Sequence, residues 1–227
     1  LTQTTSGSYL LLASLDISRR NLALRGEESF AKVMDMAEYA RREINEIGGY
    51  YAYGKELVNG TSVYDYDVTK LSVHTLGLGL AGIEVYDLLR DEYDIQIEFG
   101  DVSNILAYIS IGDRLQDIER LVGALADIAR IYKKDSTGML SGEFISPIVA
   151  RSPQEAFYSA KESLPVEKTE GRISGEFVMC YPPGIPILAP GEMITDEIIQ
   201  YILYVKEKGC SMQGTEDKSV NKLKVLV

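Results

Sequence analysis

The chain has 227 residues, of which 45% are hydrophobic and 25% charged, so it is large enough for one sizeable globular domain or two modest ones. Its 23 basic and 34 acidic residues give a net charge of −11, which argues against nucleic acid or an anionic membrane as a partner and suits a cationic small substrate. No apolar run is long enough to cross a bilayer.

The first part of the chain carries two helical patterns. Apolar residues recur at helical spacing over 8–24, and the stripe appears again over 27–47. Between them, Gly26 and the acidic pair that follows it mark a break and a new helix start. The glycine pair at 48–49 is a stop signal. We therefore expect two long helices joined by a tight turn.

The middle of the chain alternates between strand and helix patterns. We expect a strand that ends in a glycine-containing loop at 69–80, a short helix at 81–93, an alternating strand at 94–101, a central strand at 104–112, and a long helix at 113–134 capped by Asp113. This order predicts an α+β unit with one sheet and helices on one of its faces.

The last part of the chain begins with a composition shift that indicates a linker over 133–146. A helix is then expected over 152–162. Ser152 would be its cap, Pro153 its first residue and Glu155 the capping-box partner.

The segment CYPPGIPILAPGE, residues 180–192, holds four of the seven prolines of the chain. Proline removes a backbone donor and fixes φ, so neither a helix nor a central strand is expected here. We expect a stiff connector that ends a strand over 173–179. It would deliver the chain to a helix over 195–209, with Thr195 as the cap and Gly209 just past the end.

Few residues point to chemistry by themselves. The turn TTSGS at 4–8 could hold a phosphate at a helix N-terminus, although a plain N-cap is the commoner use of such a turn. His74 lies in a strand pattern, where a lone histidine is more often a packing residue than a catalyst. Glu176, just ahead of the proline segment, could meet a cationic substrate, although solvent exposure is the commoner fate.

The inventory of metal ligands and nucleophiles is also short. Cys180 and Cys210 are too few for a disulfide framework and lack metal-ligand spacing, so we expect two free thiols and no metal. A Ser-His-Asp triad could use only His74, which makes such a site unlikely on inventory alone.

Taken together and in order, several stretches resemble the bacterial ornithine/lysine/arginine decarboxylases, and most closely the shorter, biosynthetic arginine decarboxylases. The proline segment is the most specific of them. The stretches are QTTSGSYLLLASLDISRR (3–20), GLAGIEVYDLLRDEYDIQIEFGD (79–101), ILAYISIGD (105–113), SPQEAF (152–157), ISGEFVMCYPPGIPILAPGEMIT (173–195) and MQGTED (212–217).

The resemblance implies a pyridoxal 5'-phosphate enzyme with the aspartate-aminotransferase-like fold, known as fold type I. The implied fold class is α+β: connecting helices at 1–50, the small domain of that fold at 51–140, and a small α+β C-terminal decarboxylase domain at 141–227. The family's cofactor lysine lies in a Ser-x-His-Lys motif upstream of the Thr-Thr-Ser block, and this chain has no such motif. We therefore expect a C-terminal portion, opening at Leu1, that has no catalytic residue of its own and is inactive alone.

The resemblance also implies binding residues. In the family the Thr-Thr-Ser block reaches the cofactor phosphate of the neighbouring subunit, which implies that role for Thr4, with Thr5 and Ser6 close by. Gly7 stands where relatives usually carry proline, and it would loosen this turn. The glutamate before the proline segment lies towards the substrate in the family, so Glu176 is the implied partner of the substrate's distal cation.

The implied activity is decarboxylation of a cationic amino acid, with arginine giving agmatine and CO₂ for polyamine biosynthesis. The implied setting is the cytoplasm and a homodimer or higher homo-oligomer, without nucleic acid or membrane. Lysine and ornithine remain open as substrates. A stand-alone relative that has lost the cofactor half and serves assembly or regulation also remains open.

Overall fold

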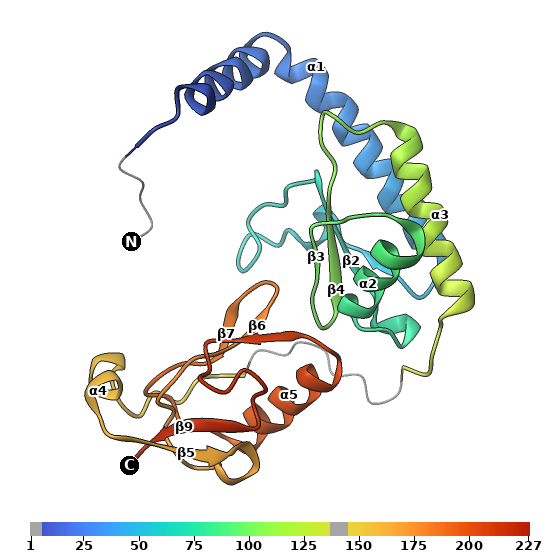
Figure 1. Ribbon diagram of the computed structural model, residues 1–227. Coiled ribbons are helices and arrows are strands. Elements are labelled where there is room, and N and C mark those ends of the chain that lie inside the picture. Colours follow the sequence, from blue (N-terminus) through green and yellow to red (C-terminus); the bar gives the residue numbers. More distant parts are fainter. Residues whose placement is uncertain (1–5, 137–144) are drawn as a thin grey trace.

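The computed structural model describes residues 6–136 and 145–227, which form two bodies that each enclose an apolar core (Figure 1). The first body, residues 9–136, contains α1 (Tyr9–Ile47), β1 (Tyr51–Ala52), β2 (Lys70–His74), α2 (Gly82–Tyr93), β3 (Phe99–Gly100), β4 (Asn104–Tyr108) and α3 (Leu115–Ile131). The second body, residues 145–227, contains α4 (Pro153–Tyr158), β5 (Lys161–Pro165), β6 (Val178–Tyr181), β7 (Ile185–Leu188), α5 (Asp196–Glu207), β8 (Ser211–Gln213) and β9 (Lys222–Leu226). Helix and sheet are mixed in both bodies.

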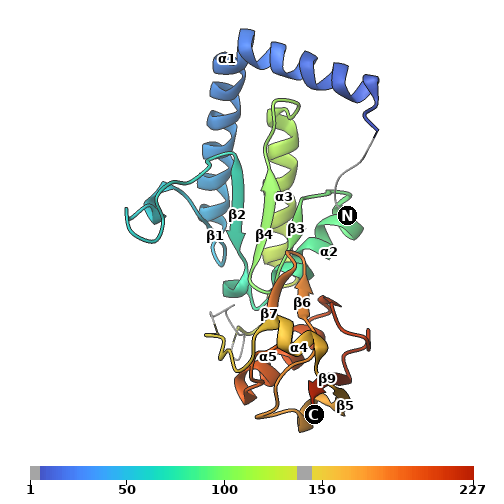
Figure 2. The same ribbon diagram turned by 90° about the vertical axis from the view of Figure 1, so that its left-hand side faces the viewer.

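The first body is built on an antiparallel sheet in the order β1-β2-β4-β3, with its helices on one face (Figures 1 and 2). In β2 the side chains alternate, so Leu71 and Val73 are buried against the helices. His74 therefore lies on the opposite, helix-free face. Its ladder partner on β4 is Asn104, which lies on the same face.

Helix α1 is a single helix of 39 residues. The expected break at Gly26 is wrong, because the helix continues through it and only its axis changes direction between the two ends (Figure 2). A glycine inside a helix costs only about 1 kcal/mol relative to alanine, and no proline interrupts the hydrogen bonds. Within residues 6–136 and 145–227, no helix is both long and apolar enough to cross a membrane.

The expected strand over 94–101 is mostly wrong. Only Phe99 and Gly100 pair with β4, although Ile97 is buried as its alternation predicts. Asp94 instead adopts a left-handed φ of 52° at the end of α2, which turns the chain before a long strand can form. The next expected strand is also shorter, since β4 ends at Tyr108.

The expected cap of α3 is also corrected. Arg114 occupies the N-cap position, and the Asp117 carboxylate accepts its backbone N–H at 3.0 Å. Asp113 instead accepts the N–H of Ser110 at 2.6 Å and closes the turn before the helix. An aspartate near a helix start satisfies either role, and the turn uses it here.

The expected helix over 152–162 is too long, because α4 ends at Tyr158 and β5 begins at Lys161. Two capping predictions in the second body are confirmed. Ser152 and Glu155 form a capping box on α4, with the Glu155 N–H donating to Ser152 Oγ at 3.2 Å and the Ser152 N–H donating to Glu155 Oε2 at 2.8 Å. Thr195 Oγ1 accepts the N–H of Ile198 at 3.3 Å at the start of α5. Gly209 follows that helix with a φ of 79°, as a glycine at this position does.

The proline segment is a β-hairpin rather than a plain connector. Its first two residues, Cys180 and Tyr181, finish β6, the central strand of the β7-β6-β8 sheet. The expected strand over 173–179 is therefore wrong at both ends, since β6 begins only at Val178 and ends at Tyr181. Pro182 and Pro183 lie in the turn, which Gly184 closes with a φ of 90°. Pro186 lies on the edge strand β7, where a missing N–H costs no ladder hydrogen bond.

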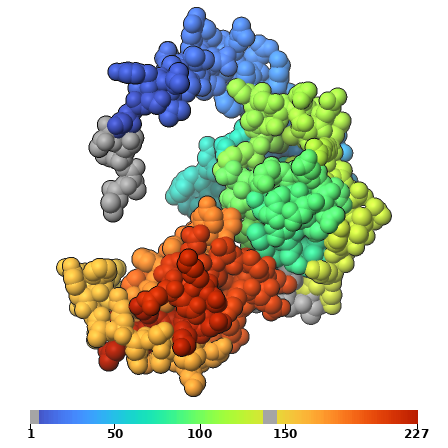
Figure 3. All heavy atoms as spheres, viewed as in Figure 1, coloured from blue at the N-terminus to red at the C-terminus, as the bar shows by residue number. Residues whose placement is uncertain are grey.

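The two bodies meet at a third apolar cluster. Val102 of the first body packs there with Cys180, Val205 and Cys210 of the second. Figure 3 shows the outer end of α1 and the second body as two arms on either side of an open hollow.

Candidate functional site

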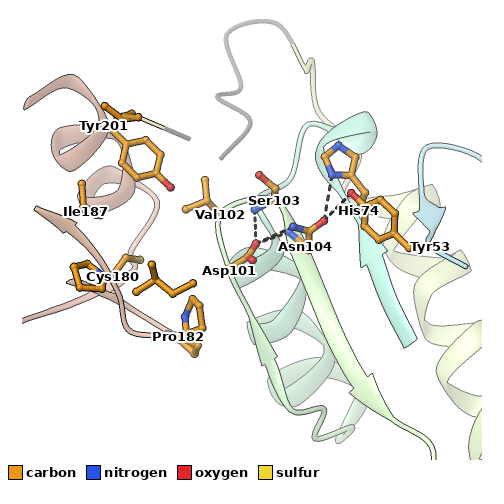
Figure 4. Close-up of a pocket in the computed structure, with 14 residues that line it drawn as sticks. Tyr53, His74, Asp101, Val102, Ser103, Asn104, Cys180, Pro182, Ile187 and Tyr201 are labelled. Carbon is orange, nitrogen blue, oxygen red and sulfur yellow. Dashed lines mark hydrogen bonds between the residues drawn. The ribbon is translucent and has the colours of Figure 1, made fainter. Parts of the chain in front are cut away.

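A pocket of about 510 Å³ lies between the two bodies (Figure 4). One wall comes from the helix-free face of the first sheet and the β3–β4 turn. The other comes from the proline hairpin and α5. The described residues that line it are Tyr53, His74, Asp101, Val102, Ser103, Asn104, Ile145, Cys180, Pro182, Pro183, Ile185, Pro186, Ile187 and Tyr201.

The polar wall is organised around Asn104. Its amide oxygen accepts the Tyr53 hydroxyl at 3.2 Å and lies 3.4 Å from His74 Nδ1 (Figure 4). Its amide nitrogen donates to Asp101 Oδ1 at 3.4 Å, which fixes the orientation of the amide. Because an amide oxygen only accepts, His74 Nδ1 is the donor in this contact.

Asp101 also shapes the turn that carries Asn104. Its Oδ1 accepts the backbone N–H groups of Ser103 and Asn104, both at 2.7 Å. Aspartate commonly closes a turn in this way, and the contact holds the β3–β4 corner at the mouth of the pocket. Burial, followed by the charge of Asp101, raises the pKa of Tyr53, so its hydroxyl remains protonated.

The second wall is largely apolar. The hairpin contributes Pro182, Pro186 and Ile187, and α5 contributes the ring of Tyr201 (Figure 4). Burial is the main cause that raises the pKa of Tyr201 to about 12. This wall therefore offers a rigid apolar surface and a phenol that stays neutral.

The pocket has an acidic side chain but no lysine or arginine among its described lining residues. The acidic side chain is that of Asp101. A ligand with an aliphatic stem and a cationic end matches one acidic group facing an apolar wall.

Glu176 does not line this pocket. Its Oε2 accepts the backbone N–H of Glu216 at 2.9 Å, and its Oε1 accepts the backbone N–H of Lys224 at 2.8 Å. Both carboxylate oxygens therefore tie the entry of β6 to the loop before β9 and to β9 itself. In the structure, Glu176 stabilises the backbone of these segments, and its contact with the substrate stays a prediction.

The other sequence-predicted binding residues lie at the start of the chain. Thr4 and Thr5 fall outside the described residues. Ser6 is described and exposed, two residues before the N-cap Ser8 of α1, and it does not line the pocket. The cofactor-phosphate role of all three stays a prediction.

The pocket brings together residues that the sequence reasoning did not select, namely Tyr53, Asp101, Asn104 and Tyr201. For Asp101 and Asn104 the sequence did contain a signal, because Asp-Val-Ser-Asn between two strand patterns is typical of a turn that an aspartate closes. Tyr53 and Tyr201 carried no such signal, since only the packing of the two bodies brings them to one cavity. Both cysteines are free, as expected. In the described part of the chain, no group of three or more histidine, cysteine, aspartate or glutamate side chains could hold a metal ion.

Comparison with known proteins gives the family context. The family described as Orn/Lys/Arg decarboxylase, C-terminal domain, matches residues 141–218. Arginine decarboxylase of Bacillus subtilis is 40% identical over 226 residues, and that of Halalkalibacterium halodurans is 41% identical over 229. Each alignment covers 98% of this chain and 46% of the relative. The chain thus spans a little under half the length of these curated relatives.

Solved structures support the fold. Constitutive lysine decarboxylase of Escherichia coli superposes with a TM-score of 0.71 at 19% identity, covering 100% of this chain and 44% of that one. Lysine decarboxylase A of Pseudomonas aeruginosa gives a TM-score of 0.68 at 18% identity, covering 99% and 43%. The chain belongs to the ornithine/lysine/arginine decarboxylase family and carries that family's C-terminal domain at residues 141–218.

Proposed function

We propose that this chain is the C-terminal portion of a pyridoxal-phosphate-dependent decarboxylase that converts arginine to agmatine and CO₂. The observation that carries the proposal is the 40% identity to an arginine decarboxylase across 98% of the chain. The charge of the pocket fits this substrate class, because a single carboxylate faces an apolar wall and no described lining residue is lysine or arginine.

The pocket does not hold the cofactor by itself. Enzymes of this kind bind pyridoxal phosphate through a lysine, and none of the described lining residues is lysine. We therefore place the cofactor lysine, together with the large domain of fold type I, on a part of the enzyme other than this chain. We assign no chemical step to the residues of this chain.

Within the enzyme, we assign the chain two tasks. The first is to form a substrate-side wall, in which Asp101 attracts the cation and the proline hairpin keeps water away from it. The second is to complete a neighbouring subunit, with Thr4, Thr5 and Ser6 near its cofactor phosphate. In support of the second task, the adjacent start of α1 exposes Tyr9 at 88%, an apolar surface that a partner would cover.

The test is a product assay on the intact enzyme with pyridoxal phosphate and equal concentrations of arginine, lysine and ornithine. We expect agmatine as the dominant product, which would fit a first step of polyamine formation. The cytoplasmic setting is a separate part of the proposal. Cadaverine as the main product would change the assigned substrate to lysine, and putrescine would change it to ornithine. If the enzyme releases CO₂ from none of the three amino acids, the proposal is refuted, and an assembly or regulatory role is favoured.

A second measurement tests where the cofactor lysine lies. The 227-residue chain alone, mixed with pyridoxal phosphate, should not develop the absorbance band of a lysine-bound cofactor. A stable band together with amine formation would contradict the assignment of the lysine to another part of the enzyme.

A further inference from the structure

Two cysteine side chains meet at the junction between the bodies. Cys180 lies on β6, and Cys210 directly precedes β8. Each is 8% exposed, and both are free thiols. Both belong to the apolar cluster at this junction, together with Val102 and Val205.

The strand register explains this contact. In the antiparallel β6–β8 pair, Cys180 lies opposite Met212 and Tyr181 lies opposite Ser211. Residues two apart in an extended chain share a face, so Cys210 faces the same side as Met212 and Cys180. Cys210 lies one residue outside β8, and its N–H donates to the Val205 carbonyl at 3.1 Å. Its backbone is thus held by the end of α5 rather than by the β6–β8 ladder.

The surroundings of the pair also favour reaction. Cys180 lines the pocket, so a small molecule that enters the pocket reaches Cys180, which lies in the same cluster as Cys210. The neighbouring Cys180 thiol lowers the pKa of Cys210 despite its burial. The neighbouring Cys210 thiol, followed by burial, raises the pKa of Cys180. One acidic thiol beside a second thiol is the arrangement in which the first is oxidised and the second resolves it.

We propose that Cys180 and Cys210 are a redox site that closes to a reversible intramolecular disulfide on reaction with a hydroperoxide. With hydrogen peroxide, the Cys210 thiolate attacks one oxygen, the O–O bond breaks, hydroxide leaves, and Cys210 becomes a sulfenic acid. The Cys180 sulfur then attacks the Cys210 sulfur. The S–O bond breaks, and the hydroxyl leaves with the Cys180 proton as water. The two sulfurs lose two electrons in all, which reduce the peroxide, and an external dithiol reverses the reaction.

The bridge would fix the strand that leads into the proline hairpin to the end of α5. It would also close a loop between residues 180 and 210, which constrains the unfolded chain. A disulfide that closes a loop of this size raises Tm by roughly 5 °C or more in a protein of this length.

The experiment treats the intact protein with hydrogen peroxide, then denatures and alkylates it and maps the peptides by mass spectrometry. In the wild type we expect the loss of both free thiols, one peptide pair joined through Cys180 and Cys210, a higher Tm, and recovery of both thiols with dithiothreitol. Two alkylatable thiols after treatment, or disulfides only between separate chains, would overturn the proposal.

Two variants test the roles within the pair. In Cys180→Ser, peroxide should leave Cys210 as a sulfenic acid that dimedone traps, because the resolving thiol is gone. In Cys210→Ser, Cys180 should oxidise at least tenfold more slowly than the pair does in the wild type. Equal rates would overturn the assignment of Cys210 as the attacking thiol. If either variant fails to fold, the wild-type peptide map decides whether the disulfide forms.

Discussion

The two halves of α1 are both helical and both carry apolar residues, yet their surroundings are opposite. In the inner half, residues 30–47, Val33, Ala37 and Ile44 are at most 1% exposed and pack into the core of the first body. In the outer half, residues 9–29, Leu10 is 83% exposed and Ile17 is 68% exposed. The same helix is therefore a core element at one end and an uncovered apolar surface at the other (Figure 1).

The difference between the two halves shows that a sequence can form a helix without packing that helix against a core. The sequence pattern predicts helix, and α1 is helical over its whole length. Packing then decides the energy, because burial of an aliphatic side chain contributes about 1.5–3 kcal/mol relative to its exposure. The inner half gains this energy within the chain. The outer half must gain it from another surface, in line with the proposed assembly.

The strongest test of the contrast is the same substitution at both ends. Ile44→Ala removes a side chain that is 0% exposed, and we expect it to lower the free energy of unfolding by about 2–5 kcal/mol through the cavity that it leaves. The matched control is Ile17→Ala in the outer half, which should change stability by less than about 0.5 kcal/mol. Urea unfolding of the 227-residue chain measures both. Equal losses at the two sites would contradict the contrast.

A second pair of variants tests the buried arginine of the inner half. Arg41 is 5% exposed, and its guanidinium donates to the backbone carbonyls of Val68, at 2.9 Å, and of Tyr53. Arg41→Met leaves these carbonyls without their donor, so we expect a loss of about 1–3 kcal/mol. It should also loosen the backbone that positions Tyr53 at the pocket.

The control for this variant is its neighbour. Arg42 is 62% exposed at its side chain and pairs with Glu43 at the surface. Arg42→Met should cost less than about 1 kcal/mol, as exposed ion pairs do. The same denaturation assay compares the two, and a larger loss at Arg42 would contradict the assigned role of Arg41.

The limits of sequence reasoning follow the same division. Local signals predicted α5 with its Thr195 cap, α4 with its capping box, and the strands β2 and β4, because each depends on residues within a few positions. The pocket depends on contacts between segments far apart, such as Tyr53 with Asn104, and periodicity carries no information about them. The proline segment shows both cases. Its chemistry excluded a helix, but its pairing with β6 became visible only in the sheet.

A third test addresses the surface that the outer half leaves uncovered. Leu11 and Leu15 are 67% and 65% exposed and lie one helical turn apart. The double variant Leu11→Ser/Leu15→Ser should leave the Tm of the 227-residue chain unchanged. In the intact enzyme we expect it to weaken assembly about tenfold or more, or roughly 1.4 kcal/mol, by analytical ultracentrifugation. Arg20→Ser is the control on the same half, and an unchanged assembly constant in the leucine variant would remove this surface from the interface.

The smallest expected effect concerns Gly26, which lies in the outer half of α1 close to the inner half. A Cβ placed at Gly26 would lie 3.9 Å from the Leu22 Cβ, an ordinary contact, and the helix is continuous there. Gly26→Ala should therefore stabilise the chain by about 0.5–1 kcal/mol, because alanine loses less backbone entropy in a helix. Gly49→Ala is the opposite control, since Gly49 has a φ of +82° and a Cβ there would overlap the Leu78 side chain. Thermal unfolding should show Tm rising in the first variant and falling in the second. A fall in both would mean that the change of direction in α1 requires glycine at position 26, and that the two halves are separated by a hinge rather than only by their surroundings.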